Sequence, residues 1–210
     1  SGYGVITKHL VPRLADHYGR DNIFIYAPVF NRDRVEIWNG IQILPGPKPD
    51  FGEETVLHHY QKYGCNIYLQ VGDWAMLTQV PQLAAEDKIL WIQWAPFDFL
   101  NCPQFCKDIL KGPIKIVPFS NYAEKRFKDA GLANVAPTIW LGLDFNIWQP
   151  LDRKGYPKIM ESLGFAEAAY NILMVQANQS RKCVRETLEG IALFRQLQPE
   201  IDTRMYLHTF

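Results

Sequence analysis

The stretch NILMVQANQSRK, residues 171–182, combines a continuous apolar run, a short polar loop and a basic pair. Residues 171–177 predict a buried strand, because this apolar run has the length of a strand and contains β-branched residues. Residues 178–180 predict a tight loop, since Asn, Gln and Ser interrupt the apolar pattern. The residues after this loop predict an amphipathic helix that ends near Leu197. A strand, a loop and a helix in this order are typical of α/β sheets.

The basic pair Arg181-Lys182 is expected to occupy the first turn of that helix. Cations there oppose the helix macrodipole, which favours negative charge at the N-terminus. We therefore expect an anion at this point. The helix N-terminus at the carboxyl end of a strand is the usual phosphate site of such folds, and Asn178 lies in the same loop. The alternative is that both basic side chains simply face water.

Composition excludes several function classes. The 210 residues suggest one large or two small domains, and 22 basic residues balance 22 acidic ones. Without a basic patch or a long run of one charge, nucleic acid is not expected as the main partner. Transmembrane and secretory classes are not expected either, because no apolar stretch approaches the roughly 18 residues of a membrane span and no basic segment opens the chain.

Four cysteines occur at positions 65, 102, 106 and 183. Only Cys102 and Cys106 are close in sequence, and their spacing is neither that of a zinc knuckle nor that of a redox Cys-x-x-Cys motif. A metal-binding pair is one interpretation. Reduced structural thiols of a cytoplasmic protein are the favoured one.

Hydrophobic periodicity and turn residues predict alternating helices and strands. In the first 142 residues, helices are expected at 5–18, 53–63, 74–84 and 121–130, and strands at 22–27, 35–38, 41–44, 66–71, 88–94, 114–117 and 135–140. Asn39-Gly40 predicts a hairpin, and Ser120 is the expected N-cap of the last of these helices. His58 and His59 are expected to be solvated on a surface helix.

The remaining residues predict a linker at 143–156 and then a helix at 157–163, the strand 171–177, the helix 181–197 and a strand at 204–208. The fold class is therefore α/β, with parallel sheets in two Rossmann-like lobes, residues 1–144 and 145–210. The first lobe opens on the glycine-containing loop Ser1-Gly2-Tyr3-Gly4 without a preceding strand, and the second is short. We expect an incomplete second lobe and a sequence that is part of a longer enzyme and inactive alone.

Four motifs in order resemble one family. They are SGYG at 1–4 with its following helix, PFSNY at 118–122, WLGLD at 140–144 followed by Phe145, Trp148 and Pro150, and the basic pair at 181–182. The chain resembles the retaining nucleotide-sugar glycosyltransferases of family 4, which have the two-lobed glycosyltransferase-B fold. The resemblance covers nearly the whole chain.

The resemblance implies transfer of a sugar from a nucleotide diphosphate sugar to an acceptor, with retention at the anomeric carbon. The acceptor, which the sequence does not identify, is a glycan, a lipid, a protein or a small molecule. Arg181, Lys182 and Asn178 are then the donor diphosphate site, and no bound metal is expected. The remaining motif residues are expected to face the cleft: Gly2, Tyr3, Gly4, Ser120 and Asp144. Cations at the diphosphate suit this chemistry, because negative charge develops on the leaving phosphate.

Departures from the family concern the catalytic residues. Many members have a histidine after the strand that ends near Trp94, whereas this chain has Ala95-Pro96-Phe97-Asp98. Asp98 is the nearest polar candidate for a sugar contact or for stabilising positive charge, and its alternative role is that of a turn-forming Asp. The family's Arg ahead of the phosphate-site Lys is replaced by Ala177, and its pair of glutamates would follow Phe210.

Two other functions remain open. One is a non-catalytic module of this fold that binds a glycan or a protein, and the other is a different two-lobed Rossmann enzyme such as a sugar-nucleotide epimerase. A cytoplasmic location is expected, and peripheral contact with a membrane is compatible with the sequence.

Overall fold

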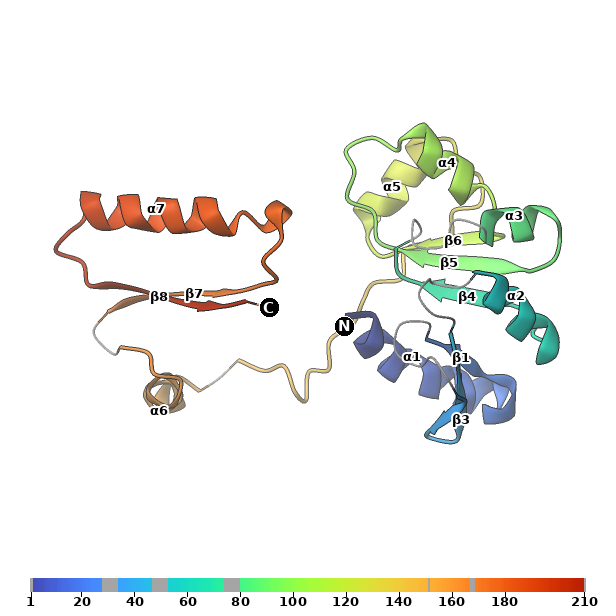
Figure 1. The fold of residues 1–210 in the computed structure, drawn as a ribbon, viewed down its shortest axis with the longest axis horizontal. Coiled ribbons are helices and arrows are strands. Elements are labelled where there is room, and N and C mark those ends of the chain that lie inside the picture. Colours follow the sequence, from blue (N-terminus) through green and yellow to red (C-terminus); the bar gives the residue numbers. More distant parts are fainter. Residues whose placement is uncertain are drawn as a thin grey trace. The chain divides into compact units, whose positions relative to one another are not determined.

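The computed structural model describes residues 2–27, 34–46, 53–73, 80–150, 152–166 and 169–209 (Figure 1). The fold is α/β, with small sheets that contain parallel strands. The chain divides into two compact units, residues 1–142 and 143–210. The boundary expected from the sequence lies two residues further along the chain.

The first unit begins with a helix and a three-stranded sheet. These elements are α1 (Gly2–Tyr18), the 3-10 turn η1 (Arg20–Asn22), β1 (Phe24–Tyr26), β2 (Glu36–Trp38) and β3 (Ile41–Leu44). Strand β3 pairs in parallel with β1 and antiparallel with β2. The predicted hairpin is confirmed, because Asn39 and Gly40 join β2 to β3 with φ angles of 52° and 77°, as a two-residue hairpin turn requires. Helix α1 packs on this sheet through Val11 and Ala15, which contact Ile41.

A second sheet in the same unit consists of parallel strands in the order β4-β5-β6. Its elements, in chain order, are α2 (Glu53–Lys62), β4 (Tyr68–Val71), α3 (Val80–Ala85), β5 (Trp91–Ala95), α4 (Gln104–Leu110), β6 (Lys115–Pro118) and α5 (Asn121–Asp129). Residues 74–79, where the predicted helix 74–84 begins, lie outside the described residues. Helix α4 was not predicted from the sequence.

Two hydrophobic clusters hold helices on this sheet. Trp91, which is fully buried, packs with Val80 of α3 and Ile89. A larger cluster places α4 and α5 against β5 and β6, and contains Ala95, Phe97, Cys106, Leu110, Ile116, Ala123, Phe127 and Leu132. The Ser120 side chain accepts a hydrogen bond from the Ala123 amide at 3.1 Å, which confirms the predicted N-cap of α5.

The predicted strand at 135–140 is wrong. Only one bridge, between Ile116 and Val135, joins this extended segment to the sheet. The Ala136 amide donates to the Ile116 carbonyl (2.8 Å) and the Ile139 amide to the Pro118 carbonyl (3.1 Å). Pro137, between them, has no N–H with which to continue a ladder.

The second unit is a two-stranded parallel sheet with helices. It contains η3 (Arg153–Gly155), α6 (Tyr156–Ser162), β7 (Tyr170–Val175), η4 (Ser180–Lys182), α7 (Val184–Leu197) and β8 (Thr203–His208). Strands β7 and β8 pair from Tyr170 with Thr203 to Val175 with His208. Helix α7 lies along these strands (Figure 1). No helix in the described part of the chain is both long and apolar enough to cross a membrane.

Two predicted helix starts are wrong. Helix α1 begins at Gly2, so that Gly2, Tyr3 and Gly4 form its first turn instead of a loop. Helix α7 begins at Val184, because Arg181 and Lys182 belong to η4 and Cys183 has left-handed backbone angles (φ 50°, ψ 43°). A residue with these angles interrupts a right-handed helix.

Glu124 of α5 joins the extended segment after β6 to the helix. Its carboxylate accepts hydrogen bonds from the Thr138 amide (2.8 Å) and hydroxyl (2.6 Å), and from Lys128 Nζ (2.6 Å). Lys128 and then Thr138 lower the pKa of this carboxyl to about 2, from an ordinary value of 4.5. Ionised Glu124 therefore favours the folded state.

We expect Glu124→Gln to lower the urea midpoint of unfolding at pH 7. Because the folded pKa lies below the unfolded one, the stabilisation by Glu124 is complete above about pH 4.5 and is lost as the pH falls toward 2. The difference between the variant and the wild type should therefore shrink over this range. Unfolding followed by tryptophan fluorescence at pH 7, 4.5 and 3 measures it.

Asp129→Asn is the matched control, since Asp129 accepts from the exposed Lys125 on the same helix (2.7 Å). Exposed ion pairs of this kind contribute little to stability, so this variant should resemble the wild type. A pH-independent difference for Glu124→Gln would contradict the role assigned to its charge.

Candidate functional site

The carboxyl ends of β4, β5 and β6 lie at one edge of their sheet, because the three strands are parallel. Asp73 follows β4, Asp98 follows β5 and Ser120 follows β6. Open α/β sheets bind their ligands at this edge. This edge is therefore the candidate site of the first unit.

Tyr3 of α1 lies against the end of β4. A Cβ atom built on Gly72 would be 3.1–3.3 Å from three atoms of the Tyr3 ring, and Gly72 has a φ of +136°. Burial and then the Asp73 carboxylate raise the pKa of Tyr3, whereas a backbone hydrogen bond from Asp73 acts in the opposite direction. The first turn of α1 therefore reaches the carboxyl edge of the sheet, although it is helical.

Two buried glutamines lie side by side on β4 and β5. Gln70 and Gln93 are paired in the register of the strands and have 7% and 0% of their surface exposed. Gln93 Nε2 donates to the Gly72 carbonyl (2.9 Å), and Gln70 Nε2 donates to the Asp73 carbonyl (3.1 Å). These side chains fix the backbone where the chain leaves β4. Neither these glutamines nor Asp73 was predicted from the sequence.

Asp98 is exposed at the carboxyl end of β5. Among the described residues no hydrogen bond or ion pair involves its side chain. The loop that contains it is attached to α5, because the Tyr122 hydroxyl donates to the Phe99 carbonyl at 2.8 Å. Ser120, by contrast, uses its hydroxyl oxygen as a helix cap.

Asp144 belongs to the second unit and shapes a turn. Its carboxylate accepts from the Asn146 amide at 3.0 Å, and its carbonyl accepts from the Ile147 and Trp148 amides at 3.0 and 2.8 Å. This is the local hydrogen bonding by which Asp commonly forms turns.

The loop between β7 and α7 contains the predicted diphosphate site. Asn178 and Arg181 are exposed and Lys182 is half-buried. The loop is closed by the Lys182 amide, which donates to the Gln179 carbonyl (2.8 Å), and by Gln176 Nε2, which donates to the Lys182 carbonyl (3.0 Å). Neither basic side chain has a hydrogen bond or an ion pair within the described ranges.

Helix α7 begins directly after this loop. Cys183, its N-cap residue, makes no side-chain capping bond. Arg181 and Lys182 lie ahead of the helix and not within its first turn. The prediction that their charges oppose the macrodipole from inside the helix is therefore wrong. The loop nevertheless brings two cations next to the N-terminal end of a 14-residue helix, where the backbone N–H groups of the first turn lack intrahelical partners.

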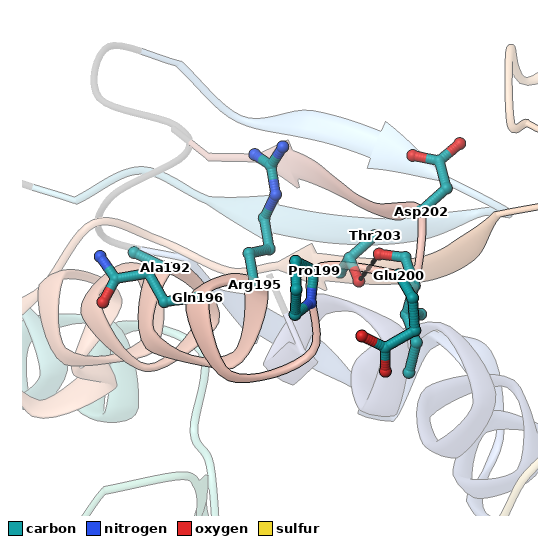
Figure 2. A pocket seen from close by; sticks show the side chains of 8 residues that line it. Ala192, Arg195, Gln196, Pro199, Glu200, Asp202 and Thr203 are labelled. Carbon is teal, nitrogen blue, oxygen red and sulfur yellow. Dashed lines mark hydrogen bonds between the residues drawn. The ribbon is translucent and has the colours of Figure 1, made fainter.

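A shallow hollow lies at the opposite edge of the second unit. It is formed by the end of α7 and the turn into β8, where the side chains of Arg195, Glu200 and Asp202 surround it (Figure 2). Asp202 there pairs with Arg204 at 3.2 Å. Because β8 starts at this edge, the hollow is remote from the loop that contains Arg181 and Lys182.

The histidine prediction is wrong for His59. This residue of α2 is 8% exposed, its Nε2 lies 2.8 Å from the Pro45 carbonyl oxygen, and its ring packs between Tyr26 and Tyr63. It is part of the packing between α2 and the first sheet.

The cysteines are unpaired in the structure. Cys106 is fully buried in the cluster under α4, and Cys102 packs against the same cluster. Burial and then the neighbouring Cys102 raise the pKa of Cys106 to about 12. No group of three or more His, Cys, Asp or Glu side chains suited to a metal ion occurs in the part of the chain that is described.

No protein-family model matches the chain, and neither does a curated protein sequence.

We expect Gly72→Ala to destabilise the protein by about 1–3 kcal/mol, the cost of holding an ordinary residue in a disfavoured backbone region. The new methyl group would also press on the Tyr3 ring. Chemical denaturation measures the loss. Gly142→Ala serves as the control, since a Cβ there meets nothing within 4 Å. Equal stability of the two variants would show that the contact between Tyr3 and Gly72 is not tight.

Proposed function

We propose that the chain is part of a retaining glycosyltransferase of the two-lobed glycosyltransferase-B type, which transfers a sugar from a nucleotide diphosphate sugar to an acceptor. The first unit would supply the acceptor side and the second the donor side. The observation that supports this most directly is the loop between β7 and α7, where Arg181 and Lys182 have no anionic partner among the described residues.

A diphosphate suits this loop for two physical reasons. The N–H groups of the first turn of α7 lack a side-chain cap, and such groups bind phosphate oxygens well. The two side chains add positive charge directly ahead of that turn. Together they would stabilise the negative charge that develops on the diphosphate as the sugar bond breaks.

The polar groups of the first unit suit a sugar. Asp98, exposed after β5, would contact a sugar hydroxyl or stabilise positive charge on the reacting sugar. Gly2 and Gly4 lie in the first turn of α1, whose Tyr3 reaches the same edge. A cytoplasmic location belongs to the proposal, because four unpaired cysteines suit a reducing compartment.

We expect the protein to bind nucleoside diphosphates and Lys182→Ala to weaken this binding by about 1–3 kcal/mol, the range for a hydrogen bond to a charged group. Lys182 takes part in the hydrogen bonds of the loop only through its backbone amide and carbonyl, which the substitution leaves in place, so the variant should keep its fold. Titration calorimetry with UDP, GDP and ADP measures the change.

Arg195→Ala is the matched control, because Arg195 is an exposed cation in the last turn of α7, at the end of the helix opposite the loop. It should bind like the wild type. An unchanged affinity of Lys182→Ala would refute the diphosphate site. The protein could also bind the nucleotides while no form of it transfers or hydrolyses a nucleotide sugar. That result would favour the non-catalytic binding module.

A further inference from the structure

The backbone at Gly72 and Asp73, directly after β4, is held by hydrogen bonds from the neighbouring strand and from buried side chains. The Gly72 amide donates to the Trp94 carbonyl (3.0 Å), and the Gly72 carbonyl accepts from Gln93 Nε2 (2.9 Å). One residue later, the Asp73 carbonyl accepts from Gln70 Nε2 (3.1 Å). Both peptide units around Asp73 are therefore fixed by the neighbouring strand or by buried side chains.

This arrangement destabilises the folded state. Gln70 and Gln93 occupy positions where a sheet interior normally has apolar side chains, and each buries a carboxamide oxygen that has no hydrogen-bond partner in the described part of the chain. A buried polar atom without a partner is unfavourable. Apolar residues at these positions would avoid the cost, but they would leave the backbone after β4 unsupported.

The fixed backbone presents one exposed acidic side chain. Asp73 is exposed, while the residue before it is covered by the Tyr3 ring. The carboxylate therefore lies next to a phenol ring at the carboxyl edge of the sheet. Side chains placed in this way by a locked backbone and packed neighbours are typical of binding sites, which require positions accurate to a fraction of an ångström.

We propose that Asp73 binds a hydroxyl group of the acceptor, and that the acceptor is neutral and polyhydroxylated at this point, as a sugar is. This inference rests on the function proposed above. A carboxylate accepts hydrogen bonds from hydroxyl groups, and the adjacent Tyr3 ring offers an apolar surface to the C–H face of a sugar. Asp73 and Asp98 both add negative charge to the edge, so an anionic acceptor group would be repelled. Asp73 is thus a positioning residue for the acceptor.

The test uses the full 210-residue chain and three probes: methyl α-D-glucopyranoside, methyl α-D-mannopyranoside and the anionic methyl α-D-glucopyranosiduronate. Each is titrated to 50 mM while the backbone amide signals of Gly72 and Asp73 are followed by NMR. At least one neutral glycoside should shift these signals in a saturable way. Asp73→Asn should weaken its binding at least fivefold, and the glucuronide should bind more weakly than the neutral glucoside to the wild type.

Asp108→Asn is the control, since Asp108 is an exposed carboxylate on α4 that pairs with Lys111 at 3.4 Å. It should leave glycoside binding unchanged. If the amide signals of Asp73→Asn outside residues 70–73 match those of the wild type, the fold of the variant is intact. Equal binding to Asp73→Asn and the wild type, tighter binding of the glucuronide, or no shift with any probe would each overturn the inference.

Nucleoside diphosphate binding separates the two proposals. If UDP, GDP or ADP binds through Lys182 but no glycoside shifts Gly72 and Asp73, the acceptor site is wrong and the transferase proposal is unaffected. If a glycoside binds at Asp73 while no nucleotide binds, the transferase proposal fails and the sugar site remains.

Discussion

The parallel pairing of β4, β5 and β6 determines where Asp73, Asp98 and Ser120 lie. Parallel strands need a connection that returns to the same end of the sheet, and here α3 and α4 belong to those connections. The residues that follow the strands, although about 25 positions apart in the sequence, are therefore neighbours at one edge. The same pairing brings Gln70, Gln93 and Ile116 into one row across the sheet. Two members of that row then support the backbone at the edge, whereas the third joins the core under α4 and α5.

Local chemistry made much of this fold predictable. Asn39-Gly40 specifies its hairpin because both residues tolerate positive φ, and Ser120 specifies a helix start because its side chain can satisfy a free amide. The apolar strand β5 is recognisable because burial demands a continuous apolar run. Strand β7 was found by the same pattern, but the prediction that it is buried is wrong, because Leu173 and Val175 are 58% and 60% exposed. Helix α4 was not predicted because it is only seven residues long. It has two buried positions, Cys106 and Leu110, which are too few to show a helical period in the sequence. Residues 135–140 have a strand-like composition, but Pro137 and the bonds from Thr138 to Glu124 direct the backbone away from a ladder.

The site was less predictable than the fold, for reasons that differ between residues. Arg181 and Lys182 were identified by their charge, yet their position relative to α7 depends on the backbone angles of Cys183, a residue type that seldom adopts them. His59 has a neighbour of the same type, and only tertiary packing distinguishes the buried ring from an exposed one. Asp73 follows a glycine and therefore resembles an ordinary turn residue in the sequence. Its surroundings depend on Tyr3, seventy positions earlier, and no local pattern contains such a pair.

The extended segment after β6 has a mechanical consequence. The Ala136 and Ile139 amides donate to β6, Thr138 binds Glu124 through two groups, and Trp94 Nε1 donates to the Ile139 carbonyl at 3.1 Å. Tension applied to the chain beyond Ile139 would therefore act on bonds to two strands and a helix, and not on a single ladder. The segment would resist peeling from the sheet although it forms no regular strand. Its last attachment, through Trp94, joins it to β5, the central strand of the sheet.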